Sequence, residues 1–435
     1  MDSDSMNVNP LKQHLGLRIV VLGTGFAGIS FLETLHSRIR GNKLNEINVT
    51  AINATDFMLF SPLLYQVATA QVSDKHISIH ASERIQDMGF NFITANIIEI
   101  NLKSNKIVTS EGEILYDYLI ISLGTENNDF GVKGVREHAI PLKSLRDGLE
   151  IRHILQDSVK NDQFLVGVDE QEEPRDTFVV VGGGASGVEL AGSIAEYANA
   201  RSVRSRDNFR VELIEAKDNL VGENDIKLSK IISDELVKSG VKVRLSSKVE
   251  EITGDEVRLS NGATIKTSHV FWAAGVQNSK IVTDLRAQGL ALQSGRILVN
   301  GNLRALGSES VFVLGDNALP TFNGRSLSVP QTAAIAVQEG RYAAMALGYL
   351  LVKGNFTGFP DFRFRNSGIM VSLGKFNGVC KLSNGIVLTG FAGWLLWRFV
   401  HLVKVRPMRN RLGVLWDWVH VPLLKNQIAF GRKLA

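Results

Sequence analysis

The pattern Gly-x-Gly-x-x-Gly occurs twice in this chain, each time directly after a run of β-branched residues and directly before a helical pattern. The first copy is formed by Gly23, Gly25 and Gly28, and the second by Gly182, Gly184 and Gly187. In such a turn the first glycine permits a sharp strand-to-helix bend, the second lets backbone approach a pyrophosphate, and the third lets helix and strand pack closely. The helix then points free N–H groups at the phosphates. One copy is weak evidence, but two copies in this context predict two dinucleotide-binding turns.

The residue that ends the second strand of each unit differs between the copies. The apolar stretches 17–22 and 178–181 precede the glycines, and residues 47–52 and 211–214 form the next predicted strands. A carboxylate at the end of that second strand accepts from ribose hydroxyls and repels a 2′-phosphate. Glu215 therefore predicts a preference for NADH over NADPH in the second unit. Asn53 holds the matching place in the first unit, with Asp56 as an alternative ribose partner.

Composition predicts a large folded core and excludes several chemistries. With 435 residues, 44% of them apolar, the chain is long enough for two or three domains. Cys380 is the single cysteine, which excludes an intrachain disulfide, a redox-active dithiol and a cysteine-ligated metal cluster. No HExxH or comparable cluster is present, so we expect no metal. The polar, acidic residues 1–6 do not resemble a targeting leader.

The last fifty residues carry the excess positive charge. Residues 386–435 contain eight Lys or Arg and one acid, a net charge of +7, whereas the whole chain has +4 and the remainder therefore −3. Four of the five tryptophans lie in the same region, namely Trp394, Trp397, Trp416 and Trp418. Aromatic and basic residues together favour a membrane interface. Nucleic-acid binding is not expected, because no base-reading module accompanies the charge.

A helix is expected around the first two of these tryptophans. Arg398, His401 and Lys404 recur at spacings of three, which places them along one side, while apolar residues fill the rest. Arg398 would lie near the middle of any spanning segment, where charge is costly, so a helix lying in the interface is expected instead of one that crosses. The open alternative is an amphipathic helix docked on the protein's own core or in a dimer interface.

The order of these features predicts an interrupted α/β arrangement. We expect two Rossmann-like domains, with residues 17–140 and 291–355 forming the first, residues 177–290 inserted as the second, and residues 356–435 forming an amphipathic membrane-association region. The acidic stretch 157–176 is expected to be a linker, and a long helix is expected over 332–352. Strands ending at Gly275 and before Asp316 place both residues at the ligand-binding edge of a sheet. Asp316 could alternatively serve as a helix or turn cap.

Several strings together resemble type II NADH:quinone oxidoreductases over nearly the whole chain. They are the first glycine turn, Phe60-Ser-Pro-Leu-Leu-Tyr-Gln-Val-Ala-Thr69, the strand end at 119–125, the second glycine turn through Glu189, the Leu314-Gly-Asp316 string and the tryptophan-rich tail. The resemblance implies FAD in the first unit together with Asp316, and NADH in the inserted unit. It also implies hydride transfer to flavin and electron transfer to a quinone arriving from the membrane, without proton pumping, at a peripheral site on the cytoplasmic face. A homodimer is expected because the apolar tail has surface to bury.

Two residues are candidates for the chemistry. In the family a glutamate two residues after the third glycine lies near flavin and nicotinamide, which here is Glu189; the alternative is a first-turn acid that complements the helix dipole. The family usually carries a Thr-Ala-Gln string near the quinone, where this chain has Ala334, so Gln331 or Gln338 is the candidate replacement. Two other functions stay open: a soluble NADH:acceptor reductase of the same fold, and a weakly active redox-sensing protein.

Overall fold

The computed structural model describes residues 16–42, 47–164, 176–201, 209–221, 225–322, 324–327, 329–366 and 368–420. Residue contacts divide the chain into two compact units. The first comprises Met1–Met58, His80–Glu126 and Gln277–Asn366, and the second comprises Leu59–Ile79, Asn127–Val276 and Ser367–Ala435. The four functional ranges expected from the sequence stay a prediction. Residues 1–6 and the last basic residues of the tail lie outside the described part.

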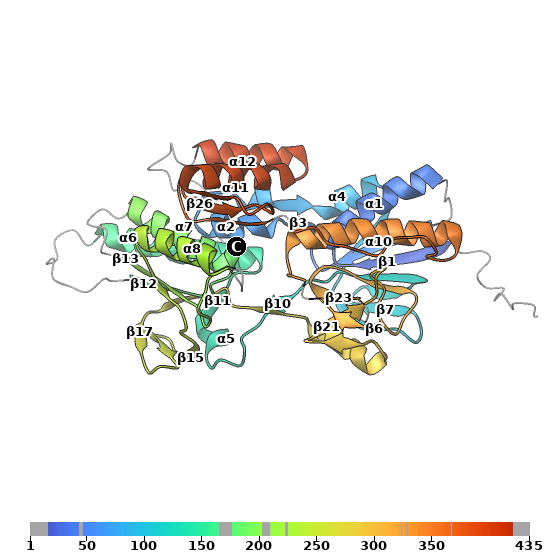
Figure 1. The fold of residues 1–435 in the computed structure, drawn as a ribbon, viewed down its shortest axis with the longest axis horizontal. Coiled ribbons are helices and arrows are strands. Elements are labelled where there is room, and N and C mark those ends of the chain that lie inside the picture. The colour runs from blue at the N-terminus through green and yellow to red at the C-terminus, as the bar shows by residue number, and fades with distance from the viewer. Residues whose placement is uncertain are drawn as a thin grey trace, which may run out of the picture. The chain divides into compact units, whose positions relative to one another are not determined.

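The first unit is built on a five-stranded parallel sheet in the order β22-β9-β1-β2-β5. Its strands are β1 (Leu17–Leu22), β2 (Ile47–Asn53), β5 (Asn91–Thr94), β9 (Tyr118–Ile121) and β22 (Val311–Val313). The cores of β1, β2, β9 and β22 are almost fully buried, as apolar runs in parallel sheets require, whereas the edge strand β5 is partly exposed. Helices α1 (Phe26–Asn42) and α10 (Ala333–Lys353) lie side by side (Figure 1). The long helix expected at 332–352 is thus confirmed, with Thr332 accepting from the Ile335 N–H as its N-cap.

The second unit repeats this plan in a parallel sheet of order β11-β18-β12-β13-β14. The strands are β11 (Ala139–Pro141), β12 (Asp176–Val181), β13 (Phe209–Ile214), β14 (Val241–Arg244) and β18 (His269–Trp272). Its larger helices are α6 (Leu145–Phe164), α7 (Ala185–Arg201) and α8 (Ile226–Lys238). In both sheets the strand before the glycines has the next strand on one side and a much later strand on the other. The predicted pair of Rossmann-like folds is therefore present.

Smaller elements flank each sheet. The first unit adds β6 (Ile97–Asn101), β7 (Lys106–Thr109), β8 (Gly112–Leu115), β20 (Leu292–Gln293), β21 (Arg296–Val299), β23 (Ala318–Phe322), β24 (Arg325–Ser326), α4 (Ala81–Asp87) and α9 (Lys280–Thr283). The second adds α2 (Leu64–Ala68), α3 (Asp74–Ile77), α5 (Val135–His138), β15 (Val249–Ile252), β16 (Glu256–Leu259) and β17 (Thr264–Lys266).

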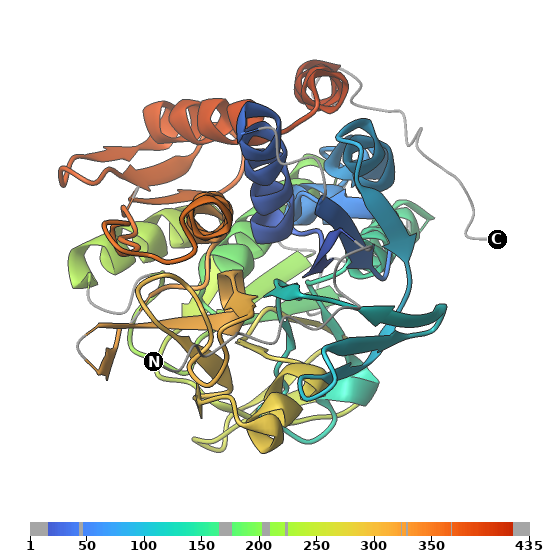
Figure 2. The same cartoon turned by 90° about the vertical axis from the view of Figure 1, so that its right-hand side faces the viewer.

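The C-terminal region forms a small sheet followed by two helices. Strands β25 (Ile369–Ser372), β26 (Gly378–Lys381) and β27 (Val387–Thr389) are antiparallel, and α11 (Gly390–Lys404) packs on β26 (Figure 1 and Figure 2). Helix α12 (Met408–His420) follows. Within the described ranges, no helix combines the length and the apolar character needed to cross a bilayer.

One local expectation was wrong and another was confirmed. The stretch expected to be a linker from residue 157 continues helix α6 to Phe164, and only residues 165–175 of that stretch lie outside the described part. The helix expected around Trp394 and Trp397 is confirmed as α11, and the residues just before it form β27, which pairs with β26.

The glycine turns require glycine for two separate reasons. Gly23 and Gly182 have positive φ angles of 88° and 114°, a region that favours glycine. At Gly28 and Gly187, an added Cβ would lie 2.1 and 1.9 Å from the carbonyl oxygens of Gly23 and Gly182. Gly25 and Gly184 instead face open space, with nothing within 4 Å of an added Cβ. The turns are closed on the protein side and open where a pyrophosphate would approach, as the sequence predicts.

The substitution Gly28→Ala should therefore destabilise the protein, whereas Gly25→Ala should not. The first forces a methyl group into backbone and should lower the free energy of unfolding by about 1–3 kcal/mol, while the second should stay within about 0.5 kcal/mol of wild type. Urea denaturation of the flavin-free proteins measures both values. Equal losses in the two variants would contradict the assigned packing role of Gly28.

Candidate functional site

Asn53 and Glu215 hold the glycine turns of their own units in the same way. The Asn53 side-chain oxygen accepts from the Thr24 N–H at 3.1 Å. The Glu215 carboxylate accepts from the Gly183 N–H at 2.5 Å and from the Lys217 N–H at 2.8 Å. Each side chain thus reaches the residue after the first glycine from the end of the second strand. The Glu215 carboxylate retains further acceptor capacity for a ribose hydroxyl, so this position fits a dinucleotide.

The Asn53 amide has a further structural task. Its nitrogen donates to the Thr55 carbonyl oxygen at 2.9 Å and to the Thr55 hydroxyl at 3.1 Å. Asp56, the alternative ribose partner, is exposed, and its carboxylate lies 4.0 Å from His80. A ribose contact for either residue stays a prediction.

Asp316 lies at the carboxyl end of β22, half-buried, in the short 3-10 turn Gly315–Asn317. Its carboxylate accepts from the Thr125 hydroxyl at 3.1 Å. The side chain of Asn317 is fully buried, accepts from the Gly124 N–H at 3.1 Å and donates to the Gly124 carbonyl at 2.7 Å. The N-cap position of this turn is held by Leu314 and not by Asp316, whose carboxylate bonds to Thr125. The ends of two adjacent strands are instead clamped together beside the first glycine turn.

Asn317 and Thr125 are site residues that sequence reasoning missed. A signal was available, since Thr125 directly follows Gly124 and Asn317 lies two residues after Gly315, each at the end of a predicted strand. Their place in one hydrogen-bonded group depends on the neighbouring positions of β9 and β22 in the sheet. That neighbour relation joins residues far apart in the chain, which local patterns do not reveal.

Glu339 is a second residue that the sequence did not single out. It lies on α10 with no exposed surface, and one carboxyl oxygen accepts from the Gly315 N–H. The other oxygen is buried and has no hydrogen-bond partner. Burial raises the pKa of Glu339 to about 8, against the opposing effects of the Gly315 N–H and the charge of Arg296. This carboxyl is therefore protonated at neutral pH, directly behind the turn that carries Asp316.

The side-chain amide of Gln338, the candidate quinone partner, is hydrogen-bonded to backbone groups. Its amide nitrogen donates to the carbonyls of Ala334 and Arg365, and its oxygen accepts from the Arg365 N–H at 2.8 Å. Gln331 is exposed and donates to the Asp316 carbonyl at 3.1 Å. The two hydrogen bonds with Arg365 hold the backbone at residue 365 against α10. A contact with quinone stays a prediction.

Glu189 is buried in α7, one residue beyond the first turn. Only 7% of its surface is exposed, and one carboxyl oxygen accepts from the Trp397 indole N–H at 2.9 Å and the Ser372 N–H at 3.2 Å. The first turn of α7 contains no acid, so the alternative of a first-turn dipole partner is wrong. Burial raises the pKa of Glu189 to about 8, more than the two hydrogen bonds lower it. Its protonated form therefore dominates at neutral pH, and the residue can donate a proton.

Gly275 follows β18 and closes the second unit's strand end. An added Cβ would lie 2.2 Å from the Phe130 ring. The Trp272 indole donates to the Asn128 carbonyl at 2.8 Å, which fixes the same strand end against the 128–130 segment. Contact of Gly275 with NADH stays a prediction.

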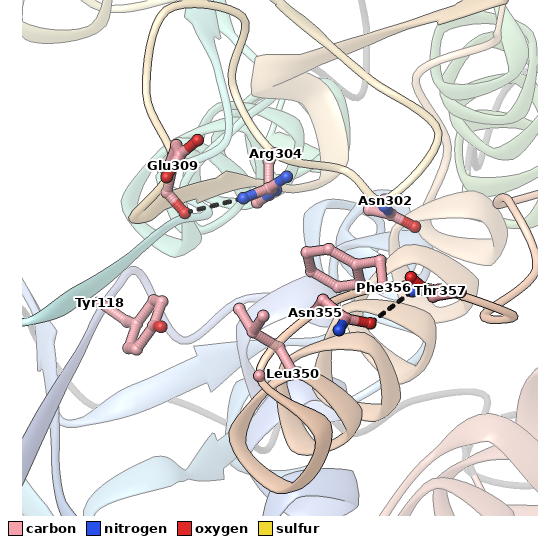
Figure 3. A pocket seen from close by; sticks show the side chains of 9 residues that line it. Tyr118, Asn302, Arg304, Glu309, Leu350, Asn355, Phe356 and Thr357 are labelled. Carbon is pink, nitrogen blue, oxygen red and sulfur yellow. Dashed lines mark hydrogen bonds between the residues drawn. The ribbon is translucent and has the colours of Figure 1, made fainter. Parts of the chain in front are cut away.

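Other chemistries find little support in the described residues. No group of three His, Cys, Asp or Glu side chains there is arranged to hold a metal ion. Burial raises the pKa of the Cys380 thiol to about 11, and its sulfur contacts the Gly393 carbonyl at 3.1 Å. A hollow of about 530 Å³ in the first unit is lined by residues such as Tyr118, Arg304 and Phe356 (Figure 3). None of the candidate site residues lines it.

The substitution Glu339→Gln should change how stability depends on pH. Between its ordinary pKa of 4.5 and about 8, Glu339 is protonated when folded and ionised when unfolded, so wild type loses stability as pH rises. The amide keeps an acceptor for the Gly315 N–H but does not titrate. Relative to wild type, the variant should therefore gain on the order of a few kcal/mol between pH 5 and pH 8, measured by thermal unfolding. Glu309→Gln, at an exposed acid in the same unit, is the control, and a pH-independent difference for Glu339→Gln would contradict the assignment.

Comparison with known proteins agrees with this geometry. The profile of the pyridine nucleotide-disulphide oxidoreductase family matches residues 17–340. A protein named probable NADH dehydrogenase from Dictyostelium discoideum is 28% identical over 96% of this chain and 91% of its own length. A type II NADH:quinone oxidoreductase from Mycobacterium tuberculosis is 29% identical over 94% of this chain and 88% of its own.

The same fold is found in a solved structure. NDH2 from Plasmodium falciparum, in complex with NADH, superposes with a TM-score of 0.82 at 17% identity, covering 94% of this chain and 98% of that one. The family profile covers both glycine turns and the strands around them, and the solved structure shares the overall fold. The chain belongs to the pyridine nucleotide-disulphide oxidoreductase family.

Proposed function

We propose that this protein is a FAD-dependent NADH:quinone oxidoreductase of the type II class, which does not pump protons. The observation that carries the proposal is the presence of two equivalent glycine turns in one chain, each open toward a pyrophosphate and each held by a side chain from the next strand. The relative from Mycobacterium tuberculosis bears this activity in its name. With Cys380 as the single cysteine, the chain has no dithiol through which electrons could pass.

The residues divide between the two nucleotides. Gly23, Gly25, Gly28, Asn53 and Asp316 would hold FAD in the first unit. Gly182, Gly184, Gly187, Glu215 and Gly275 would hold NADH in the second. Bound FAD supplies hydride acceptance from NADH and two-electron delivery to a quinone.

Quinone reduction takes up two electrons and two protons, and hydride transfer together with one solvent proton provides them. Glu189 is suited to hold and pass that proton, since its buried carboxyl keeps it at neutral pH. Ala334 has no side-chain hydrogen-bonding group, and the Gln338 amide is hydrogen-bonded to backbone.

A membrane surface is the second element of the proposal, and the orientation of α11 supports it. Phe391, Leu395, Phe399 and Val403 recur every four residues and are about half exposed or more. Arg398 lies instead between the rings of Trp394 and Trp418, at 4.1 and 4.5 Å from their centres. A helix on a water-exposed surface normally shows its polar side outward. Here the apolar side is outward, as in a helix that lies in a lipid interface.

Neighbouring residues extend this face. On α12, Leu412, Leu415, Trp416 and Val419 are also exposed, and exposed Lys404, Arg406 and Arg409 supply positive charge for anionic lipid. We further propose a peripheral location on the cytoplasmic face, where NADH is available, and a homodimer.

The function is tested by mixing the purified protein anaerobically with NADH and then with menaquinone or ubiquinone analogues while following the flavin absorbance. Bleaching by NADH and recovery on quinone addition are expected. Recovery with a soluble dye or oxygen, but with no quinone, would favour the soluble acceptor reductase. Bleaching without recovery by any acceptor would favour a redox sensor, and absence of flavin would overturn the assignment of the first unit.

Glu215→Gln should relax the preference for NADH over NADPH. Loss of the carboxylate charge removes repulsion of the 2′-phosphate, and the amide still accepts from Gly183, so the ratio of kcat/KM values should fall by about tenfold. Steady-state kinetics with both nucleotides measure the ratio. Asp234→Asn, at an exposed acid on α8, is the matched control. An unchanged ratio for Glu215→Gln would remove the residue from nucleotide selection.

Leu395→Glu combined with Phe399→Glu should release the protein from membranes. Withdrawing both apolar side chains should weaken partitioning to anionic vesicles by about a hundredfold or more, measured by co-sedimentation. Ile226→Glu, which replaces a 77% exposed apolar residue on α8, should leave binding unchanged. Undiminished binding of the double variant would show that α11 is not the anchor.

A further inference from the structure

The inward side of α11 reaches the acid proposed for quinone reduction. Trp397 is fully buried, on the side of the helix away from the exposed residues Leu395 and Phe399. Its indole N–H donates to Glu189 at 2.9 Å. The other donor to the same oxygen is the Ser372 N–H on β25. Both donors therefore come from the C-terminal region, while the carboxyl belongs to the helix that begins at the second glycine turn.

The indole is held in place from several sides. His401 stacks on Trp397 with ring centres 4.0 Å apart. The rings of Tyr65 and Trp397 meet in an edge-on arrangement, with their centres 5.9 Å apart. The His401 ring nitrogen lies 2.8 Å from the Trp397 carbonyl oxygen. These ring contacts fix the orientation of the indole, so that its N–H points toward Glu189.

A second tryptophan connects the same region to the Phe60–Thr69 string. The Trp418 indole on α12 donates to the Gln66 side-chain oxygen at 2.7 Å. The Gln66 nitrogen in turn donates to the Tyr65 hydroxyl at 3.0 Å. Gln66, Tyr65 and Trp397 are all almost fully buried. The two C-terminal helices thus contribute one indole N–H each to a single buried polar group around Glu189.

The charged and titratable groups around this carboxyl are few. Tyr65 on α2 and Cys380 on β26 interact with its charge and stay neutral, because burial raises both of their pKa values. On α11, Arg398 keeps its charge between two indoles, and burial lowers the pKa of His401 to about 4. Tyr65, Cys380 and His401 are therefore neutral, and the charge of Arg398 is not among the causes that shift the pKa of Glu189. The two N–H donors are the groups that favour its ionised form.

We propose that Trp397 is a positioning residue for quinone reduction, through which the membrane-facing helix sets the orientation and proton affinity of Glu189. The inference rests on the proposed function. It assigns two roles to one helix: the outward side meets lipid, and the inward side completes the proton-donating group. Deleting the C-terminal region would remove both roles together, so single substitutions are needed to separate them.

The test follows flavin reoxidation by a quinone analogue in stopped flow as a function of pH. In Trp397→Phe the ring remains but the N–H donor is lost, so Glu189 should hold its proton to higher pH and the alkaline limb should move up by roughly one pH unit. Tyr349→Phe, which removes a hydroxyl on α10 that donates to the Thr357 carbonyl, should reproduce the wild-type profile. In Glu189→Gln the limb should disappear.

Three further measurements make the outcome decisive. Replacing Trp397 by its isosteric benzothienyl analogue, which has no N–H, should shift the limb in the same direction while preserving packing. Vesicle binding should be retained in Trp397→Phe, and the pH profile should be retained in Phe399→Ser despite weaker binding. A wild-type-like profile in both the phenylalanine and the benzothienyl variants would overturn the inference, whereas failure of any quinone to reoxidise wild-type flavin would instead overturn the proposed function.

Discussion

The close contact between the third glycine and the carbonyl of the first is the constraint on which both units depend. At Gly28 and Gly187 the helix backbone comes so near the preceding turn that no side chain fits. This contact fixes where each helix begins relative to its strand and leaves the N–H groups of its first turn directed outward. The second strand then delivers Asn53 or Glu215 to the same turn. Backbone packing thus fixes the shape of both turns that are proposed to bind nucleotides.

Close packing of this kind also explains why acids become buried. Gly340 lets α10 approach α1 so closely that an added Cβ would lie 2.2 Å from the Ala27 carbonyl. The preceding residue, Glu339, is fully buried against the Gly315 N–H, and burial raises its pKa to about 8. Glu189 follows Gly187 by two residues and is enclosed by the C-terminal region. In each case a carboxyl that water would ionise is held neutral at pH 7, because burial penalises its charged form more than the available donors stabilise it.

The sequence predicted what local patterns determine. Both glycine turns, strands β1 and β12 and the long helix α10 agree with expectation, since buried parallel strands and capped helices have distinct patterns. The hydrogen bonds of Asn317 and Glu339 were not foreseen, because they join segments distant in the chain. The spacing of polar residues along α11 also did not predict which side of the helix faces outward. The spacing of Arg398 and His401 suggested a polar side, but stacking on tryptophans turned both residues inward, and aromatic packing of that kind is a tertiary effect.

The most direct test of the account is an infrared titration of Glu189 in the intact flavoprotein. The carboxylic C=O stretching band present in wild type and missing in Glu189→Gln reports the protonated side chain. The account predicts that this band is strong at pH 7 and disappears with a midpoint of about 8, and that its frequency shifts in Trp397→Phe because the indole donor is gone. If the band is absent at pH 7, Glu189 is ionised there, and its role as the proton donor in quinone reduction is contradicted.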